Sequence, residues 1–453
     1  MSKINSLKGK TSSVAMLALL TAASLSSFSL PVSAVTDPVV FTFSTVGDTR
    51  QDPASPDPTT LLPPPPATGG ALLPQDAQWL QNTRVWARVM RTVQSQKANL
   101  LFVNGDMIMG YGRAAVPSAW STTPPATTNA VVNSDLVRFY TQYAYWRGMV
   151  ANSLETGTYI VPVPGNHETQ CSTKVTTNGT YNFGATPIAS GCMKNPDGST
   201  GKFAYVENEN AWRANMGDLI GDLSANVRFQ TVVGVPALSV KGLISTEAPT
   251  SATDPGITTD QSELSYSFDI NTAAGRLHFA VVNTDATGFD SKAPTGWLSA
   301  DLAAAQGRGV VKYFVFGHKP AFTYNYLQSP GTVPAAGLDV DKAARADFWN
   351  LIVQYKATYF CGHEHSFKID SHANVDPSGN EILGAIPSYH VLVGTGGSPF
   401  DAKTTDVLEN PHARYYAWAT VRVHQSGNVT LDAYGFDTGF GPTQLIQSIG
   451  SLQ

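Results

Sequence analysis

Residues 39–50 read VVFTFSTVGDTR, an apolar run that ends in a polar turn. Its first eight residues are mainly β-branched or aromatic, which is typical of a strand. The turn places Asp48 and Arg50 directly behind this strand. We therefore predict a strand over Val39–Val46 whose carboxyl end presents a carboxylate and a guanidinium group.

The same arrangement recurs four more times. The further pairs of an apolar run and a glycine-led polar cluster are 100–103 with Gly105-Asp106, 159–163 with Gly165-Asn166-His167-Glu168, 310–316 with Gly317-His318, and 358–360 with Gly362-His363-Glu364-His365. Each cluster alone is also compatible with an ordinary turn or a helix cap. Because carboxyl ends of strands converge in α/β folds, the ordered set indicates one shared site.

Helical and strand patterns alternate around these clusters. Helices are predicted at 76–96, 135–150, 297–305 and 341–355. Additional strands are predicted at 277–282, 390–393, 416–423 and 429–434. Alternation early in the chain and more strands late in it predict a mixed α/β sandwich.

Composition narrows the class of protein. The chain has 453 residues, 42% of them hydrophobic and 14% charged, which allows one large domain with inserted loops and excludes disorder throughout. The densest proline-rich stretch, 53–70, is predicted to be an exposed loop. The formal net charge is −5 and no run of lysine or arginine occurs. We therefore expect no nucleic-acid partner.

The first 34 residues resemble a targeting segment. Three lysines precede a short apolar run over 14–23, and a small-residue cleavage pattern ends at Ala34. A membrane anchor is the alternative, but this run is shorter than the roughly 18–20 residues that a spanning helix needs. We predict a signal peptide over 1–34, a single catalytic domain over 35–453 with no membrane span, and a secreted or periplasmic location.

The order of the polar clusters between residues 47 and 365 resembles that of the calcineurin-like metallophosphoesterases, which include the purple acid phosphatases. Segments 266–269, 297–302 and 394–397 are similar to supporting segments of that family. The resemblance implies an α/β fold, a four-layer α/β/β/α sandwich of two mixed β-sheets, with two metal ions at one edge.

The resemblance also implies a ligand set of six residues. Asp106 would bridge the ions, with the remaining ligands divided into Asp48 and His365 at one ion and Asn166, His318 and His363 at the other. Carboxylate, amide and imidazole donors suit Fe, Mn or Zn. Two such ions, about 3.5–4 Å apart, would hold a bridging water, lower its pKa to give a hydroxide, and neutralise the phosphoryl oxygens.

His167 follows a ligand but is not a ligand in the family. The resemblance implies that it stabilises the transition state or protonates the leaving oxygen, with Glu168 orienting it.

Two departures from the family pattern concern the first metal. Arg50 stands where many members have a histidine ligand, and Met109 stands where purple acid phosphatases have a tyrosine, the nearest tyrosine here being Tyr111. The first ion is therefore one protein ligand short, weakly held, or completed by water. Arg50 is expected either to bind a substrate phosphate, which guanidinium geometry suits, or to form a salt bridge at the pocket rim.

Three cysteines occur in the sequence. Cys171 and Cys192 are predicted to form a disulfide in an oxidising compartment, with two free thiols as the alternative. Cys361 lies in an apolar stretch and is predicted to be a buried thiol.

Together these features predict a metal-dependent hydrolase of small phosphate esters, either monoesters or diesters, located outside the cytoplasm. The alternative is a catalytically silent metal- or phosphate-binding protein that retains the fold. A nuclease of the same family is disfavoured by the acidic charge. Neither oligomeric state nor metal identity follows from the sequence.

Overall fold

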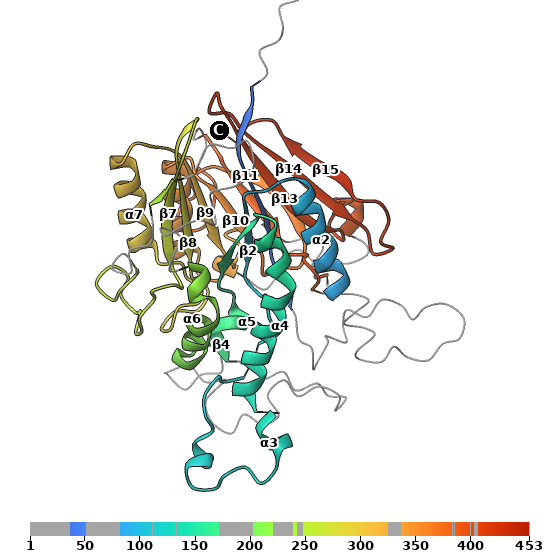
Figure 1. Ribbon diagram of the computed structural model, residues 1–453. Coiled ribbons are helices and arrows are strands. Elements are labelled where there is room, and N and C mark those ends of the chain that lie inside the picture. Colours follow the sequence, from blue (N-terminus) through green and yellow to red (C-terminus); the bar gives the residue numbers. More distant parts are fainter. Residues whose placement is uncertain are drawn as a thin grey trace, which may run out of the picture. The chain divides into compact units, whose positions relative to one another are not determined.

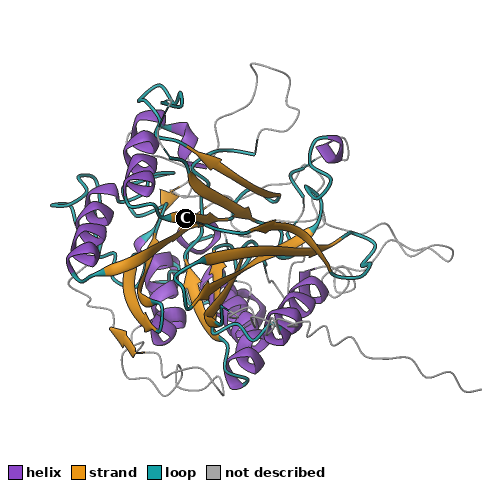
Figure 2. Cartoon of the chain, turned by 90° about the horizontal axis from the view of Figure 1, so that it is seen from above, coloured by secondary structure: helices purple, strands orange, loops and turns teal. Residues whose placement is uncertain are grey.

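Two mixed β-sheets form the centre of the protein (Figures 1 and 2). The first has the order β15-β14-β13-β1-β2-β3, and the second β11-β12-β10-β9-β8-β7-β6. The strands of the first sheet are β1 (Val39–Val46), β2 (Leu100–Asn104), β3 (Tyr159–Val163), β13 (Tyr416–His424), β14 (Val429–Phe436) and β15 (Gln444–Ile449). Those of the second are β6 (Ser239–Lys241), β7 (Tyr266–Thr272), β8 (Gly275–Val282), β9 (Val310–Gly317), β10 (Thr358–Cys361), β11 (Phe367–His372) and β12 (Ser388–Val393).

This computed structural model describes most of the chain beyond the predicted signal peptide. The described residues are 37–50, 82–110, 112–132, 134–171, 203–220, 239–241, 248–324, 337–382, 384, 386–398, 400–402 and 406–452. Pro38–Gln453 form one compact unit. The predicted signal peptide, the proline-rich loop 53–70 and Tyr111 lie outside the described residues.

Phenylalanine rings fill the space between the two sheets. Phe43 of β1 lies 5.0 Å from the ring of Phe314 and 5.6 Å from that of Phe360, both in the second sheet. Phe102 of β2 stacks on Phe316 of β9 with ring centroids 3.7 Å apart. Such rings each bury about 150–250 Å², so the aromatic residues seen in the sequence form the interface that holds the sheets together.

Helices cover the outer face of each sheet. On the first sheet, Trp86 of α2 (Arg84–Ser95) stacks on Trp146 of α4 (Asp135–Glu155) above a shared apolar core. On the second, α7 (Thr295–Gly307) and α8 (Lys342–Gln354) bury Leu298 and Trp349 in a separate core. Figure 1 shows α7 next to strands of the second sheet and α2 next to β13 of the first sheet. The predicted α/β/β/α sandwich is therefore confirmed.

Further elements complete the fold. They are α3 (Thr128–Val132), α5 (Asn166–Thr169), α6 (Val206–Ile220), and a small sheet of β4 (Gln170–Cys171) with β5 (Phe203–Ala204). Within the ranges that the structure describes, no helix combines the length and the apolar character needed to cross a membrane.

The carboxyl ends of the parallel strands meet at one edge of the sandwich. The Gly47 N–H donates to Val393 O at 2.8 Å and so links β1 to β12 of the other sheet. Next to this link, the Asp48 N–H donates to Gly105 O at 3.0 Å. These backbone bonds bring the turns that follow strands of both sheets to the same place.

Every strand predicted from an apolar run is present, whereas more polar elements were missed. The helix predicted at 76–96 is described from residue 84 onward. β11 and β15 were not predicted because their side chains are largely half-buried or exposed. α6 was missed because its inner face is partly polar: Asn208 is buried and its side chain hydrogen-bonds to three backbone groups.

A buried charge network attaches α7 to the second sheet. His278 of β8 lies opposite Asp269 of β7, and its Nδ1 is 2.7 Å from Asp269 Oδ1. Its Nε2 is 2.8 Å from Asp301 Oδ2 on α7, and Arg308 Nε lies 2.7 Å from Asp269 Oδ2. Burial opposes a charged imidazole, but the hydrogen bonds to Asp269 and Asp301 outweigh it and raise the pKa of His278.

This network predicts a pH-dependent stability. The raised pKa of His278 means that its contribution is complete below about pH 6.5 and is lost as pH rises through the folded-state pKa. The pKa of Asp269 is lowered despite its burial, through bonds to His278 and Arg308, so its contribution is lost only in acid. His278→Gln should therefore lower the free energy of unfolding by about 3–5 kcal/mol at pH 6 and by less at pH 9, measured by urea denaturation.

The matched control is His424→Gln. The Nε2 of His424 lies 3.2 Å from the hydroxyl oxygen of Thr430, which is an uncharged partner, unlike the carboxylates that contact His278. This variant should lower the free energy of unfolding less, and by a similar amount at pH 6 and pH 9. An equal loss at pH 6 and pH 9 for His278→Gln would contradict a charged imidazole in the network.

Candidate metal centre

The structure places all six predicted ligands at the edge where the strand ends meet. Asp48 follows β1, Asp106 follows β2, Asn166 begins α5 after β3, His318 follows β9, and His363 and His365 follow β10. Ligand-type atoms of Asp48, Asp106 and His318 lie within 4.8 Å of one another, and all three residues are buried. Residues far apart in sequence therefore form one polar cluster.

Four of these residues surround one point, which we call the asparagine position. His318 Nε2 lies 3.1 Å from Asp106 Oδ1 and 2.9 Å from Asn166 Oδ1. His363 Nδ1 lies 2.9 Å from Asn166 Oδ1 and 3.2 Å from His318 Nε2. Metal–ligand bonds of about 2.1 Å put neighbouring ligands about 3.0–3.4 Å apart, so these separations suit one bound ion.

The other ligands form what we call the Asp48 position. His365 Nε2 lies 3.4 Å from Asp48 Oδ1, and Asp106 belongs to the same buried cluster. The backbone N–H of His365 donates to Asp401 Oδ2 at 2.7 Å, which fixes the turn that carries the ring. This position has fewer protein donors than the asparagine position.

The unsatisfied atoms at this edge match a cation. Among the described residues, Asp48 Oδ1, Asp106 Oδ2 and both ring nitrogens of His365 are buried without a hydrogen-bond partner. Buried polar atoms normally have partners, and carboxylates that lack them are costly. His318 Nδ1 lies 2.7 Å from Asn104 O, so Nδ1 carries the hydrogen and Nε2 faces the cluster, as in metal-bound histidines. The residues present therefore fit metal ions.

The charged groups of the cluster influence one another. Burial raises the pKa of Asp48. Burial also opposes charge on His318, but the neighbouring Asp106 outweighs it and raises the pKa of His318 to about 9. Burial likewise opposes charge on Asp106, but attraction to His167, His318 and Arg50 holds its pKa well below its usual range. Burial lowers the pKa of His363 well below its ordinary value. Positively charged groups around Asp106 therefore stabilise its carboxylate, a role that bound cations would share.

The glycines of the clusters are required by close approach. A Cβ at Gly105, whose φ is +80°, would lie 2.3 Å from His318 Nδ1. A Cβ at Gly362 would lie 2.4 Å from Asp48 Oδ2. The glycine before each polar residue therefore lets backbone and ligands from different strands meet.

His167 is buried beside the ligands with its ring fixed by a backbone carbonyl. Its Nδ1 lies 2.5 Å from Met109 O, so Nδ1 carries the hydrogen. Its Nε2 lies 3.4 Å from Asp106 Oδ2. The tautomer directs Nε2 toward the cluster.

Glu168 does not orient His167, and that expectation was wrong. Its carboxylate accepts four backbone hydrogen bonds instead, from the N–H groups of Gly165, Asp106, Met107 and Ile108, at 2.8–3.1 Å. Burial and the nearby Asp106 raise the pKa of Glu168 to about 7, although these bonds favour the charged form. Glu168 fixes the turn that carries Asp106, and Met109 is the group that orients His167.

Arg50 forms a salt bridge with a predicted ligand. Its Nη2 lies 3.5 Å from Asp106 Oδ2, and its side chain is 14% exposed. Of the two expectations for Arg50, the salt bridge is present, but its partner is in the cluster and is not a rim residue.

Sequence reasoning missed the support behind His318. The adjacent Lys319 is buried, and its Nζ lies 2.5 Å from Asp285 Oδ1, 3.1 Å from Asp290 Oδ1 and 2.7 Å from Ser291 Oγ. A lysine directly after a predicted ligand and an apolar strand was the available signal. Its partners could not be located without the fold.

Cys171 is buried and disulfide-bonded at the end of β4. Its predicted partner, Cys192, lies outside the described residues, so the pairing stays a prediction. Cys361 is a buried free thiol, as expected.

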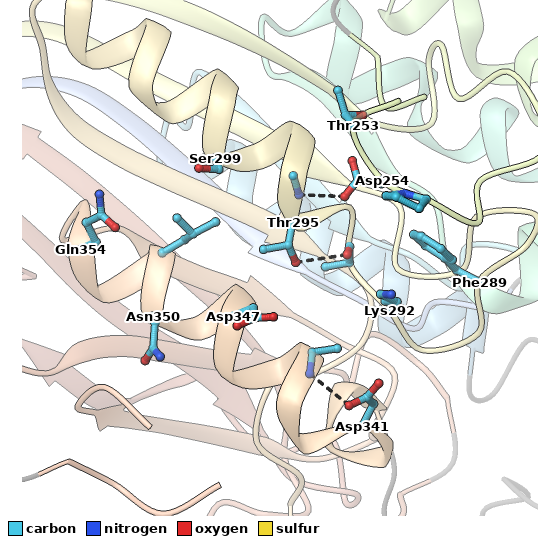
Figure 3. A pocket seen from close by; sticks show the side chains of 15 residues that line it. Thr253, Asp254, Phe289, Lys292, Thr295, Ser299, Asp341, Asp347, Asn350 and Gln354 are labelled. Atoms are coloured by element: carbon cyan, nitrogen blue, oxygen red, sulfur yellow. Dashed lines mark hydrogen bonds between the residues drawn. The ribbon is translucent and has the colours of Figure 1, made fainter. Parts of the chain in front are cut away.

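A separate pocket of about 690 Å³ lies between α7 and α8 (Figure 3). Two of its carboxylates cap these helices: Asp254 accepts from the N–H groups of Gly296 and Trp297, and Asp341 caps the first turn of α8. Since these charges stabilise helix ends, we assign no ligand to this pocket.

Comparison with known proteins gives only distant similarities. No protein-family model and no curated protein matches this chain. Among solved structures, the purple acid phosphatase PPD1 from yellow lupin (Lupinus luteus) seeds is similar at 13% identity and a TM-score of 0.45, over 91% of this chain and 54% of that one. This chain therefore spans about half the length of the lupin protein.

Two further solved structures are similar to this chain. A dimetal phosphatase from Danio rerio has 11% identity and a TM-score of 0.38, covering 90% of this chain and 99% of that one. PhoD has 10% identity and a TM-score of 0.44, covering 91% and 73%. Identities and TM-scores this low carry no functional argument, so function has to be argued from the residues of this chain.

The role of Glu168 gives a testable prediction. Glu168→Gln turns an amide NH₂ toward backbone N–H donors, so at least one buried donor loses its acceptor. The free energy of unfolding at pH 8 should fall by about 1–3 kcal/mol or more. Urea denaturation with far-UV circular dichroism measures this loss.

Glu364→Gln is the matched control. The Glu364 carboxylate accepts one backbone bond, from Tyr324 N, and burial raises its pKa to about 8. The amide oxygen of glutamine can accept the same bond, so the free energy of unfolding should fall less than in Glu168→Gln. Equal losses for both variants would show that the four-bond arrangement of Glu168 is unimportant.

Proposed function

We propose that this protein is a metal-dependent hydrolase of phosphate esters that uses two metal ions, each Fe, Mn or Zn. The observation that carries this proposal is the buried cluster, in which carboxylate, amide and imidazole atoms lie at separations suited to shared cations. This donor set contains no thiolate and suits those metals.

We assign Asp106, Asn166, His318 and His363 to the asparagine position, and Asp48 and His365, with Asp106 shared, to the Asp48 position. When bound, such ions polarise phosphoryl oxygens and make water a better nucleophile at neutral pH. Glu168 keeps Asp106 in place through the backbone, and Asn104 holds the tautomer of His318. These contacts pre-organise the ligands before any ion binds.

His167 is the proposed acid. Because its Nδ1–H donates to Met109 O, Nε2 is the atom that gains or gives up a proton. The ring is buried, and its Nε2 lies 3.4 Å from Asp106 Oδ2 at the edge of the cluster. We propose that Nε2–H protonates the leaving oxygen or stabilises the charge that develops there.

Arg50 is the proposed substrate contact. Its planar guanidinium has a fork of N–H donors that suits two phosphate oxygens. The side chain is partly exposed at the edge of the cluster. To contact a phosphate it must exchange its ion pair with Asp106 for the substrate.

The second candidate is a catalytically silent protein that binds metal or phosphate. It is favoured by one observation, the replacement of a usual histidine ligand by Arg50. The buried His167, with its tautomer fixed, favours the enzyme. The expected substrate is a small phosphate ester, and the proposed location, outside the cytoplasm, rests on the sequence of residues 1–34.

His167→Ala separates the two candidates. Since His167 is not assigned as a ligand, metal content should stay almost unchanged. Turnover should fall about 10²–10⁴-fold, the usual effect of losing a positioned acid. The loss should be smaller for esters with good leaving groups, which need little protonation. Metal content per chain is measured together with hydrolysis of a chromogenic monoester and diester.

His363→Ala is the control, because it should lose metal first and activity as a consequence. If His167→Ala loses as much metal as His363→Ala, His167 is a ligand or a structural residue. Absence of turnover in the wild type, with metal bound and a broad ester panel tested, would favour the silent binder.

Export makes a prediction about processing and the disulfide. Mass spectrometry of protein exported with its own N-terminus should find a chain beginning near Val35. Non-reduced peptides should show Cys171 linked to Cys192, a closure that contributes on the order of 3 kcal/mol. An uncleaved N-terminus would contradict the signal peptide, and alkylation of both cysteines as free thiols would contradict the pairing.

A further inference from the structure

The two halves of the cluster offer a metal ion different surroundings. At the asparagine position, four donors form a chain of contacts at 2.9–3.2 Å. At the Asp48 position, the contact between Asp48 Oδ1 and His365 Nε2 is 3.4 Å, and Asp106 must be shared. Ligand number alone therefore favours the asparagine position.

Arg50 adds a positive charge beside the shared ligand. Its Nη2 lies 3.5 Å from Asp106 Oδ2, an oxygen without a hydrogen-bond partner among the described residues. A cation seated next to Asp106 competes with a metal ion for that oxygen and repels the ion.

The backbone of Arg50 is held in place, so this pairing is built into the turn. The Arg50 N–H donates to Asp106 O at 2.8 Å, and Arg50 O accepts from Asn82 Nδ2 at 3.0 Å. Its φ of +37° is unusual for a residue with a side chain, and the turn keeps it there. The guanidinium therefore starts from a fixed point next to the shared carboxylate.

We propose that Arg50 competes with the metal ion at the Asp48 position for Asp106. The asparagine position binds its ion tightly. The Asp48 position binds its ion weakly, because that ion must displace Arg50 from Asp106. This inference rests on the proposed metal centre and adds to it an unequal affinity of the two positions and the residue that causes it.

Titration of the metal-free full-length chain with Mn²⁺ tests the inference by calorimetry. The wild type should show two affinity classes. Arg50→Gln should strengthen the weaker class by about 10–100-fold, because it removes a positive charge that competes for Asp106, and leave the tighter class unchanged. Electron paramagnetic resonance should show a spin-coupled Mn²⁺ pair only after the second equivalent in the wild type.

Two controls keep the result specific. Arg50→Lys retains the charge and should change the weaker class much less than Arg50→Gln. Arg422→Ala removes an arginine that pairs with Asp432 on the first sheet and should change neither class.

The outcomes separate this inference from the proposed function. Equal affinity for both ions in the wild type, or no change in Arg50→Gln, overturns the inference while ester hydrolysis can still be observed. If Arg50→Gln fails to fold, equal affinities in the wild type still overturn the inference, and Arg50→Lys still tests the role of the charge. Absence of Mn²⁺ binding and of hydrolysis in the wild type would overturn the proposed function and this inference together.

Discussion

The structure depends on one constraint, the burial of Asp48 and Asp106 where the two sheets meet. Neither carboxylate is exposed, and removing such charges from water costs several kcal/mol each unless cations compensate them. His318 and Arg50 provide part of that compensation. The glycines at the strand ends allow it, because a side chain at Gly105 or Gly362 would push the partners apart. Stability and a cation site thus follow from the same arrangement.

A third buried carboxylate, Glu168, positions the backbone of the site. It accepts backbone N–H groups from the turn after β2 and from the start of α5. Backbone N–H groups, and not a cation, stabilise the negative charge of Glu168. Burial still raises its pKa to about 7. Asp106, which faces His318 and Arg50, has a lowered pKa instead. The fold therefore uses one carboxylate to position the backbone and leaves its neighbour oriented toward cations.

Sequence patterns predicted those parts of the fold that depend on local chemistry. Apolar β-branched runs located strands that are largely or wholly buried, and glycine-led clusters located the turns of the site. The role of Glu168 was not predictable, because its partners at Asp106–Ile108 lie about 60 residues away along the chain. Lys319 was missed for the same reason. β15 was missed because an edge strand with exposed side chains lacks the apolar signal.

Charge balance connects the departure at Arg50 to the proposed chemistry. With His318 as a neutral ligand of one ion, Asp48, Asp106 and Arg50 would leave one net negative charge, which that single divalent ion would already reverse. A second divalent ion would then add positive charge to a site that is already positive, which is unfavourable in a buried setting. A phosphate ester brings negative charge to the same place and offers Arg50 an alternative partner.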